Sequence, residues 1–365
     1  MITCRAPGKL FIAGEYAVVE PGRRAVLTAV DRYATATVRA TTGSETTLRS
    51  DLDGGVTLTC HRRGDRIVPA TNDFGVPAAF SYVFAAVEII DRLLGERGLA
   101  ARPYRLELGT DLGDADGRKF GLGASAAVTA ATVAAVGQFH ALDLDEMARY
   151  RLAMLATIAV NRRASGGDVA AATWGGWIAY SSPDRDRAAA TAAEHGIDAA
   201  LRTPWPGLSV RALPEPAGLA LRVGWTGTPA STPHLVAGLS KNRAPADRAR
   251  FHTGSDACVE RLTTAFDSGD TAAISDEIHC ARELLIELDE AEGLGIMTPR
   301  LRALCAAAAA VGAAAKPSGA GGGDCGIAFV EHTDTAALAE LGDRWLAAGI
   351  RPLPLRTPVH EGSCR

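Results

Sequence analysis

A glycine-rich turn that leads directly into a long run of small residues constrains this chain more than any other feature. The turn is Gly121-Leu122-Gly123-Ala124-Ser125-Ala126-Ala127. Its glycines let backbone N–H groups approach an anion, and a helix beginning at Ala124 or Ser125 directs its positive dipole end at the same point. The turn therefore predicts a phosphate site, although a tight connection between two elements would have the same composition.

Lysine is scarce in this sequence. Among 38 Lys and Arg residues only four are lysine, namely Lys9, Lys119, Lys241 and Lys316. A compact ammonium fits against a phosphate oxygen beside a backbone loop, where a planar guanidinium does not. Three of the four lie in or next to a glycine-rich stretch, whereas Lys241 is the best candidate for chance retention on the surface. The lysines therefore indicate where bound phosphate is held.

Length and composition predict two domains with cores of Ala, Val and Leu. The chain has 365 residues, of which 47% are hydrophobic and only 5% aromatic, a composition that favours close packing of helices on sheets. The formal net charge of -4 gives no general attraction to nucleic acid or to an anionic membrane. An anionic ligand must therefore be held by local charge.

The seven cysteines are scattered and show no C-x-x-C spacing. This pattern predicts reduced thiols in a cytoplasmic protein, with neither a disulfide framework nor a zinc site. The first residues lack the charged and apolar regions of a signal peptide. The Ala-rich stretches 124–136 and 303–315 are too short to span a membrane.

Hydrophobic periodicity predicts mixed α/β organisation. In the first half, strands are expected at 3–6 and 10–13 around a turn at Pro7-Gly8-Lys9, and at 25–30, 33–40, 56–60, 66–68, 104–108 and 176–180. Helices are expected at 77–98, 124–140 and 145–160, and a short one after Asp168. The second half alternates strands at 219–225, 325–330 and 352–355 with helices around 246–267, 271–290, 299–311 and up to 348. The Pro-containing and charged segment 181–216 separates the halves, so the predicted domains are residues 1–183 and 184–365.

Three glycine-rich segments lie far apart in the sequence, each with a lysine in or beside it. They are Ala6-Pro7-Gly8-Lys9-Leu10 with Gly14-Glu15-Tyr16-Ala17-Val18-Val19, then Gly121 to Ala127, then Ser318 to Gly326. Together they resemble the three signature motifs of the GHMP kinases, a superfamily named after galactokinase, homoserine kinase, mevalonate kinase and phosphomevalonate kinase. The resemblance covers essentially the whole chain. It implies a two-domain α+β fold with an N-terminal α/β domain of the ribosomal protein S5 domain 2-like type, a ferredoxin-like C-terminal domain, and an active site in the cleft between them.

Four further stretches resemble the bacterial phosphomevalonate kinases within this superfamily. They are Gly117-Arg118-Lys119-Phe120, Ser165-Gly166-Gly167-Asp168, Gly224 to Thr232, and Lys316 to Gly326. The resemblance implies ATP-dependent phosphorylation of 5-phosphomevalonate to 5-diphosphomevalonate, a step of the mevalonate pathway toward isopentenyl diphosphate. The implied partners are these two small molecules, without nucleic acid or membrane, and the oligomeric state is not specified by the sequence.

The same resemblance assigns roles to individual residues. Lys9 and Asp168 match the catalytic lysine and aspartate of the superfamily. The ATP phosphates would be held by Lys119, Gly121, Leu122, Gly123, Ala124, Ser125 and Ala126, with the Ser125 hydroxyl on Mg²⁺. The substrate would be held by Lys9, Glu15, Tyr16, Arg118, Lys119, Ser165, Gly166, Ser231, Thr232, Lys316, Ser318, Gly319 and Ala320.

Several of these residues also have simpler interpretations. Ser125 and Asp168 are each suited to capping the helix that follows, as are Ser231 and Thr232. Arg118 and Lys119 would also fit a solvated loop pair, and the run from Ser318 to Gly323 would also suit a flexible entry into a strand.

Two departures from the superfamily pattern concern the metal. Ala124-Ser125 replaces the commoner Ser-Ser, and the segment Met147 to Gly167 has no carboxylate, whereas mevalonate kinase relatives have a Mg²⁺-binding glutamate there. The metal would therefore rely on Ser125, ATP oxygens, water and Asp168.

The acceptor atom would be a phosphate oxygen, and a phosphate monoester with a second pKa of about 6 is largely dianionic at neutral pH. A general base is then scarcely needed, so we expect Asp168 to orient Lys9 or a metal-bound water.

Two alternatives remain open at this point. Another GHMP enzyme, such as mevalonate kinase or diphosphomevalonate decarboxylase, would differ in the anion of its acceptor, and Arg118-Lys119 with Trp225 to Thr232 argue against it. A non-catalytic relative that binds a nucleotide or metabolite has no use for Lys9, Ser125 and Asp168 together.

Overall fold

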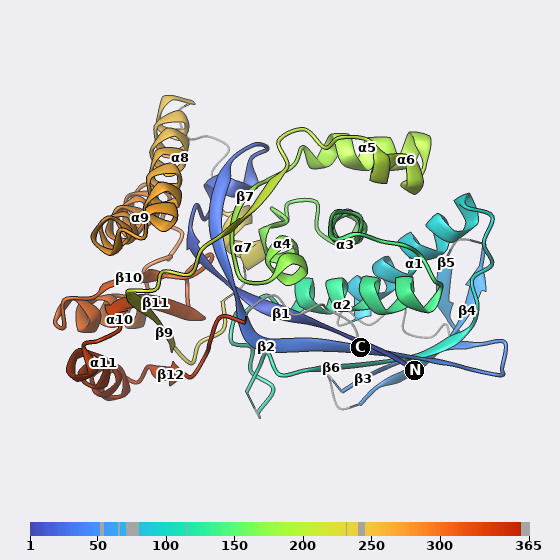
Figure 1. Ribbon diagram of the computed structural model, residues 1–365, viewed down its shortest axis with the longest axis horizontal. Helices are drawn as coiled ribbons and strands as arrows, with labels where there is room; N and C mark the ends of the chain where they lie inside the picture. The colour runs from blue at the N-terminus through green and yellow to red at the C-terminus, as the bar shows by residue number, and fades with distance from the viewer. Residues whose placement is uncertain are drawn as a thin grey trace.

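The computed structural model describes residues 1–51, 55–64, 66–70, 80–114, 116–230, 232–239 and 245–358, without the side chains of residues 232–234. Two domains lie side by side, and each consists of a sheet packed with helices (Figure 1). This arrangement confirms the predicted two-domain α+β class.

The first domain is a large sheet covered on one face by helices (Figure 1). Its strand order is β5-β4-β3-β6-β2-β7-β8, and β1 pairs with β2 off this path. The strands are β1 (Ile2–Ala13), β2 (Arg24–Ala40), β3 (Thr46–Ser50), β4 (Thr57–Arg63), β5 (Arg66–Pro69), β6 (Tyr104–Thr110), β7 (Trp177–Ser181) and β8 (Ser209–Leu213). The helices are η1 (Ala17–Val19), α1 (Ser81–Glu96), α2 (Ala124–Phe139), α3 (Glu146–Val160), α4 (Gly167–Trp174), α5 (Arg185–His195) and α6 (Ile197–Arg202).

The expected turn at Pro7-Gly8-Lys9 is wrong, because β1 runs unbroken through these residues. The strand only shifts register against β2 between Pro7 and Gly8. A Cβ on Gly8 would lie 2.8 Å from the carbonyl oxygen of Leu122, so the glycine serves the close approach of the glycine-rich turn. The Lys9 N–H donates to that same Leu122 oxygen at 2.9 Å. The bulge therefore ties β1 to the predicted phosphate loop.

Helix α2 is buried almost all round, as its Ala/Val composition predicts. Small side chains let it pack closely against β1, β2 and helices α1 and α3. Its amino-terminal end is therefore held rigidly by the core of the first domain.

The second domain is an antiparallel sheet of order β10-β11-β9-β12, packed with helices in the arrangement expected of a ferredoxin-like domain. Its strands are β9 (Leu219–Trp225), β10 (Ala314–Pro317), β11 (Cys325–Glu331) and β12 (Arg351–Leu353). Its helices are α7 (Thr232–Ala237), α8 (Pro245–Ser268), α9 (Thr271–Glu292), α10 (Pro299–Ala309) and α11 (Thr335–Ala347).

The predicted domain boundary after residue 183 precedes three elements that pack with the first domain. Strand β8 pairs with β7, helix α6 contacts α1 and α3, and helix α5 contacts α3 and α6. We propose that the first domain extends through Leu213, because the connection to β9 follows that residue.

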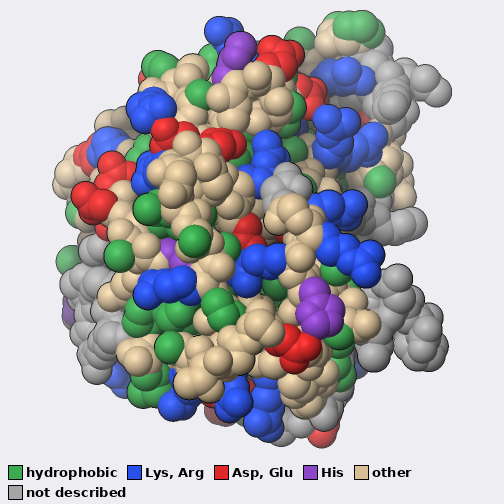
Figure 2. Space-filling model, turned by 90° about the vertical axis from the view of Figure 1, so that its right-hand side faces the viewer, with side chains coloured by type: hydrophobic (Ala, Val, Ile, Leu, Met, Phe, Trp, Pro, Cys, Tyr) green, Lys and Arg blue, Asp and Glu red, His purple; other side chains and the backbone are tan. Residues whose placement is uncertain are grey.

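Within the described part of the chain, no helix is both long enough and apolar enough to cross a bilayer. Basic and acidic side chains are interspersed on the face shown in Figure 2. Cys60, Cys258, Cys280, Cys305 and Cys325 are free thiols. The expectation of reduced thiols throughout is wrong for Cys4, which is disulfide-bonded, and Cys364 lies outside the described residues.

Candidate active site

A cavity of about 510 Å³ lies where β1, the glycine-rich turn, the α3–α4 connection and loops of the second domain meet. Its wall brings together most of the residues predicted from the sequence. The predicted residues that line it are Lys9, Glu15, Tyr16, Lys119, Gly121, Leu122, Gly123, Ala124, Ser125, Ala126, Ser165, Gly166, Asp168, Gly319 and Ala320.

The glycine-rich turn has the backbone conformation that only glycine adopts easily. Gly121 and Gly123 have φ angles of 81° and 77°, and Gly123 is the N-cap residue of α2. A Cβ on Gly123 would lie 3.0 Å from Lys9 Cε and 3.4 Å from an oxygen of Asp168. The absence of a side chain at this position therefore leaves room for the lysine and the aspartate beside the helix end.

Lys9 and Asp168 lie next to each other beside this turn. Lys9 Nζ is 3.7 Å from Asp168 Oδ2 and donates to the carbonyl oxygen of Gly121 at 3.2 Å. The lysine is buried, whereas 38% of the Asp168 side chain is exposed to the cavity and solvent. The ammonium therefore lies beside the phosphate loop, with a carboxylate that fixes its direction.

Two buried tyrosines support the backbone just before Asp168. The hydroxyl of Tyr180 donates to the carbonyl of Ser165 at 2.7 Å and lies 2.9 Å from the hydroxyl of Tyr150. Burial raises the pKa of both tyrosines, so both stay protonated and act as donors. Gly166 has a φ of 85°, and a Cβ on it would lie 2.7 Å from Tyr180 Oη. This packing sets the start of α4, whose first turn contains Asp168.

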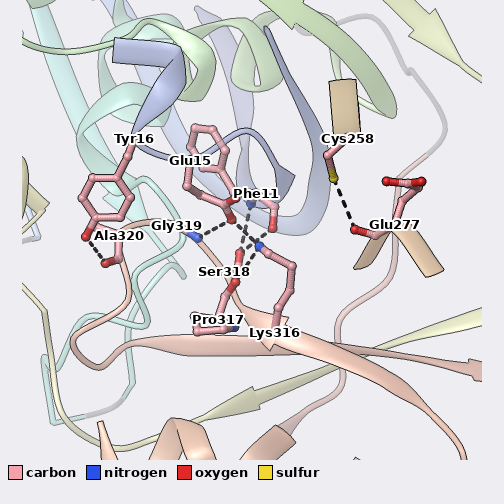
Figure 3. A network of polar contacts seen from close by, with 10 residues as sticks. All are labelled: Phe11, Glu15, Tyr16, Cys258, Glu277, Lys316, Pro317, Ser318, Gly319 and Ala320. Carbon is pink, nitrogen blue, oxygen red and sulfur yellow. Dashed lines mark hydrogen bonds and ion pairs between the residues drawn. The ribbon is translucent and has the colours of Figure 1, made fainter. Parts of the chain in front are cut away.

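A buried network joins the third glycine-rich segment to the end of β1 (Figure 3). Lys316 Nζ donates to Glu15 Oε1 and, at 2.7 Å, to the carbonyl of Pro317. The same Glu15 oxygen accepts from the Gly319 N–H at 3.3 Å. Tyr16 Oη donates to the carbonyl of Ala320 at 2.5 Å, and burial raises the pKa of this tyrosine. The network therefore holds Gly319 and Ala320 in the cavity wall.

Three further residues predicted to contact substrate, Lys316, Ser318 and Arg118, do not line the cavity. Lys316 is fully buried in its pair with Glu15. The Ser318 hydroxyl accepts from the Phe11 N–H and donates to the Phe11 carbonyl, both at 3.0 Å. Arg118 pairs with two aspartates of its own loop and lies over the Trp225 ring. Lys316 and Ser318 therefore contact neighbouring backbone, whereas Arg118 contacts side chains, and a substrate contact for the three stays a prediction.

Two predicted substrate residues fall at the edge of the described chain. Ser231 lies outside the described residues, and Thr232 is described only as the first residue of α7. Lys241, which was expected to be a surface residue without a site role, also lies outside them.

Asp324 is a cavity residue that the sequence interpretation missed. Its Oδ1 accepts from the Ala230 N–H at 3.0 Å, and a Cβ on Gly121 would be 2.5 Å from its Oδ2. Burial raises the pKa of this carboxyl group, while the nearby Lys9 and Lys119 lower it. The sequence signal that could have identified Asp324 is its position directly after Gly321-Gly322-Gly323, because a carboxylate is unusual in a segment predicted to line a site for a phosphorylated substrate.

Fold and cavity together are those of a small-molecule kinase with a glycine-rich phosphate loop between two domains. Models of the GHMP kinase N-terminal domain and C-terminal domain match residues 81–176 and 262–345. A phosphomevalonate kinase of Streptomyces sp. (strain CL190) is 50% identical over 99% of this chain and 98% of that protein.

Solved structures show the same likeness. The Lin0012 protein of Listeria innocua superimposes with a TM-score of 0.89 at 31% identity, over 100% of this chain and 98% of that one. Streptococcus pneumoniae phosphomevalonate kinase in complex with phosphomevalonate and AMPPNP gives a TM-score of 0.85 at 29% identity, over 98% and 100% of the two chains.

The chain therefore belongs to the GHMP kinases. Within them, its full-length relatives place it in the phosphomevalonate kinase family.

Proposed function

We propose that this chain transfers the γ-phosphoryl group of ATP to (R)-5-phosphomevalonate, giving ADP and (R)-5-diphosphomevalonate in the mevalonate pathway of isoprenoid biosynthesis. We also propose a cytoplasmic location, because ATP, the proposed phosphoryl donor, is an intracellular metabolite. The observation that carries the proposal is the convergence of Lys9, Asp168 and the Gly121–Ala126 turn on one cavity.

The electrostatics of the cavity suit two polyanionic ligands. ATP and the phosphorylated acceptor repel each other, and catalysis of phosphoryl transfer consists mainly of positioning and charge neutralisation. Lys9 and Lys119 supply positive charge, and the amino-terminal end of α2 supplies unpaired N–H groups. Because the cavity is partly closed from water, these charges act more strongly than they would in bulk solvent.

Asp168 acts as an orienting group in this proposal. Its carboxylate lies 3.7 Å from Lys9 Nζ, so it fixes the ammonium toward the phosphate loop. The acceptor phosphate is already ionised at neutral pH, and therefore the reaction needs no proton acceptor of its own.

The residues present fit a magnesium ion. Mg²⁺ prefers oxygen ligands, and the cavity wall offers the exposed Ser125 hydroxyl together with the Asp168 and Asp324 carboxylates. Within the described residues, no hydrogen bond engages the Ser125 hydroxyl. We propose that Ser125 holds the metal, which when bound would neutralise charge on the ATP phosphates.

Substrate discrimination tests the proposal. A coupled assay of ADP release with mevalonate, 5-phosphomevalonate and 5-diphosphomevalonate should give turnover with 5-phosphomevalonate alone. Turnover with mevalonate would make the chain a mevalonate kinase, and ADP with carbon dioxide from 5-diphosphomevalonate would make it a decarboxylase. Nucleotide binding without turnover of any of the three would indicate a sensor.

A further inference from the structure

Helices α8 and α9 form an antiparallel hairpin with Gly269 in its turn. Residues of the two helices that are the same number of positions from Gly269 in the sequence lie next to each other. Arg261 and Glu277 each lie eight residues from it, and Arg261 Nε donates to Glu277 Oε1 at 2.5 Å. Gly254 and Leu284 each lie fifteen residues away, and a Cβ on Gly254 would be 3.2 Å from Leu284 Cδ2. Equal offsets give equal height, because both helices rise by the same step per residue.

Cys258 and Cys280 form one rung of this ladder, each eleven residues from Gly269. Their sulfur atoms and a carboxylate oxygen of Glu277 all lie within 4.8 Å of one another. Cys258 is 1% exposed, and Cys280 is half-buried and reachable from solvent. The Cys258 thiol donates to the Glu277 carbonyl at 3.4 Å (Figure 3). Side-chain rotation is what would bring the two sulfurs to the disulfide distance of about 2.0 Å.

We propose that Cys258 and Cys280 are a modification site, a dithiol that a hydroperoxide converts into an intramolecular disulfide. The half-buried Cys280 thiolate attacks the peroxide, taking one oxygen as a sulfenic acid and releasing the other as water or alcohol after protonation. The Cys258 thiol then attacks that sulfur, and the sulfenic hydroxyl leaves with the thiol proton as water. Both electrons removed from the sulfurs reside in the reduced peroxide.

The charge around the pair favours this chemistry over a metal site. Arg261 engages both carboxylate oxygens of Glu277, at 2.5 and 2.9 Å, and its Nη2 lies 3.6 Å from the sulfur of Cys280. A divalent cation bound by the two sulfurs and Glu277 would be repelled by this guanidinium. The cation would also have to displace Arg261 from the Glu277 carboxylate.

The position of the pair links it to the active site. Cys258 lines a small pocket together with Gly14 and Glu15, which lie at the end of β1. Glu15 in turn holds Gly319 in the wall of the catalytic cavity. A covalent link between α8 and α9 would therefore fix the hairpin beside Glu15 of this network, and we expect turnover to change on oxidation.

Peptide mapping without reductant tests the pair directly. The reduced protein is titrated with hydrogen peroxide, digested, and examined for a peptide joining residues 258 and 280. The variants are Cys258→Ser and Cys280→Ser, and Cys305→Ser is the matched control because that buried thiol lies outside the hairpin. Wild type and Cys305→Ser should form the 258–280 link, and dithiothreitol should reverse it. Cys258→Ser should instead accumulate a sulfenic acid at Cys280 that dimedone traps.

Activity supplies the second measurement. Peroxide should change kcat/KM reversibly in wild type and Cys305→Ser, and should have no reversible effect in Cys280→Ser, whose half-buried position tolerates serine. Overoxidation of Cys280 in wild type without a 258–280 link would overturn the proposal. So would zinc that stays bound to wild type and is lost from Cys280→Ser, since the cluster would then be a metal site. Equal responses in all variants would overturn the link to turnover.

Discussion

Replacement of Lys316 by methionine should destabilise the protein by about 3–5 kcal/mol, the usual cost of removing one partner from a buried ion pair. The side chain of Lys316 is fully buried and that of Glu15 is 3% exposed, so bulk water cannot solvate the carboxylate that remains. Among the residues that the structure describes, the Gly319 N–H, at 3.3 Å, is the donor that would remain for it. Methionine has nearly the length of lysine, so the loss is electrostatic rather than a cavity effect.

Urea unfolding followed by tryptophan fluorescence measures this loss. Arg344→Met is the matched control, because Arg344 pairs with Glu340 on the exposed face of α11, where the side chains are 46% and 53% exposed. Such surface pairs contribute about 0–1 kcal/mol. The double variant Glu15→Gln/Lys316→Met leaves no charge at these two positions and should regain part of the lost stability. The Lys316→Met variant should also lose kcat/KM, because Gly319 and Ala320 line the cavity.

Two results would refute this reasoning. If Lys316→Met unfolds at the same urea concentration as Arg344→Met, the buried pair contributes no more than a surface pair. If the double variant is as unstable as Lys316→Met alone, an uncompensated charge on Glu15 is not the cause of the loss.

Three further predictions follow from single sites. Asp168→Asn should lower kcat but keep the acid limb of the pH–rate profile, since that limb reflects the acceptor phosphate near pH 6; loss of the limb would make Asp168 the base. Gly123→Ala should lower melting temperature and kcat more than the control Gly117→Ala, because both have φ near 78° but only at Gly123 does a Cβ meet Lys9; scanning fluorimetry and ADP release compare them. Burial lowers the pKa of His140 from 6.5 to about 4, so its stabilising contribution is present above pH 6.5 and is lost as pH falls toward 4. Urea midpoints of His140→Gln should fall less over that range than those of wild type, and parallel curves would contradict the assignment.

Local pattern was enough to predict most helices. Helix α3 begins after Asp145, whose side chain accepts from the Ala148 N–H at 2.7 Å, and α9 begins in the same way after Asp270. Helix α10 begins after Thr298 with Pro299 in its first turn. Caps, prolines and apolar periodicity act within a few residues of one another, so the sequence shows them directly.

Strands were harder to predict because their partners are distant. Strand β3, which no pattern indicated, lies parallel to β6 with Leu48 opposite Leu106. Strand β8 falls in the predicted interdomain segment 181–216, where no strand was expected, yet it completes the first sheet beside β7. A short strand gains its stability from a neighbour that local periodicity does not specify.

By itself, the sequence predicted a phosphate loop at Gly121–Ala126 served by Lys9 and Asp168, and it indicated the GHMP kinases, the family that the comparisons confirm. Only the tertiary structure decided which of the other charged residues face the cavity and which pair with a buried partner. Lys316 sits in a buried pair with Glu15, 301 residues away, and Asp324 faces the cavity against Gly121. A motif states which residue types are present, but whether a charge meets a ligand or a buried partner depends on groups that folding brings from the other end of the chain.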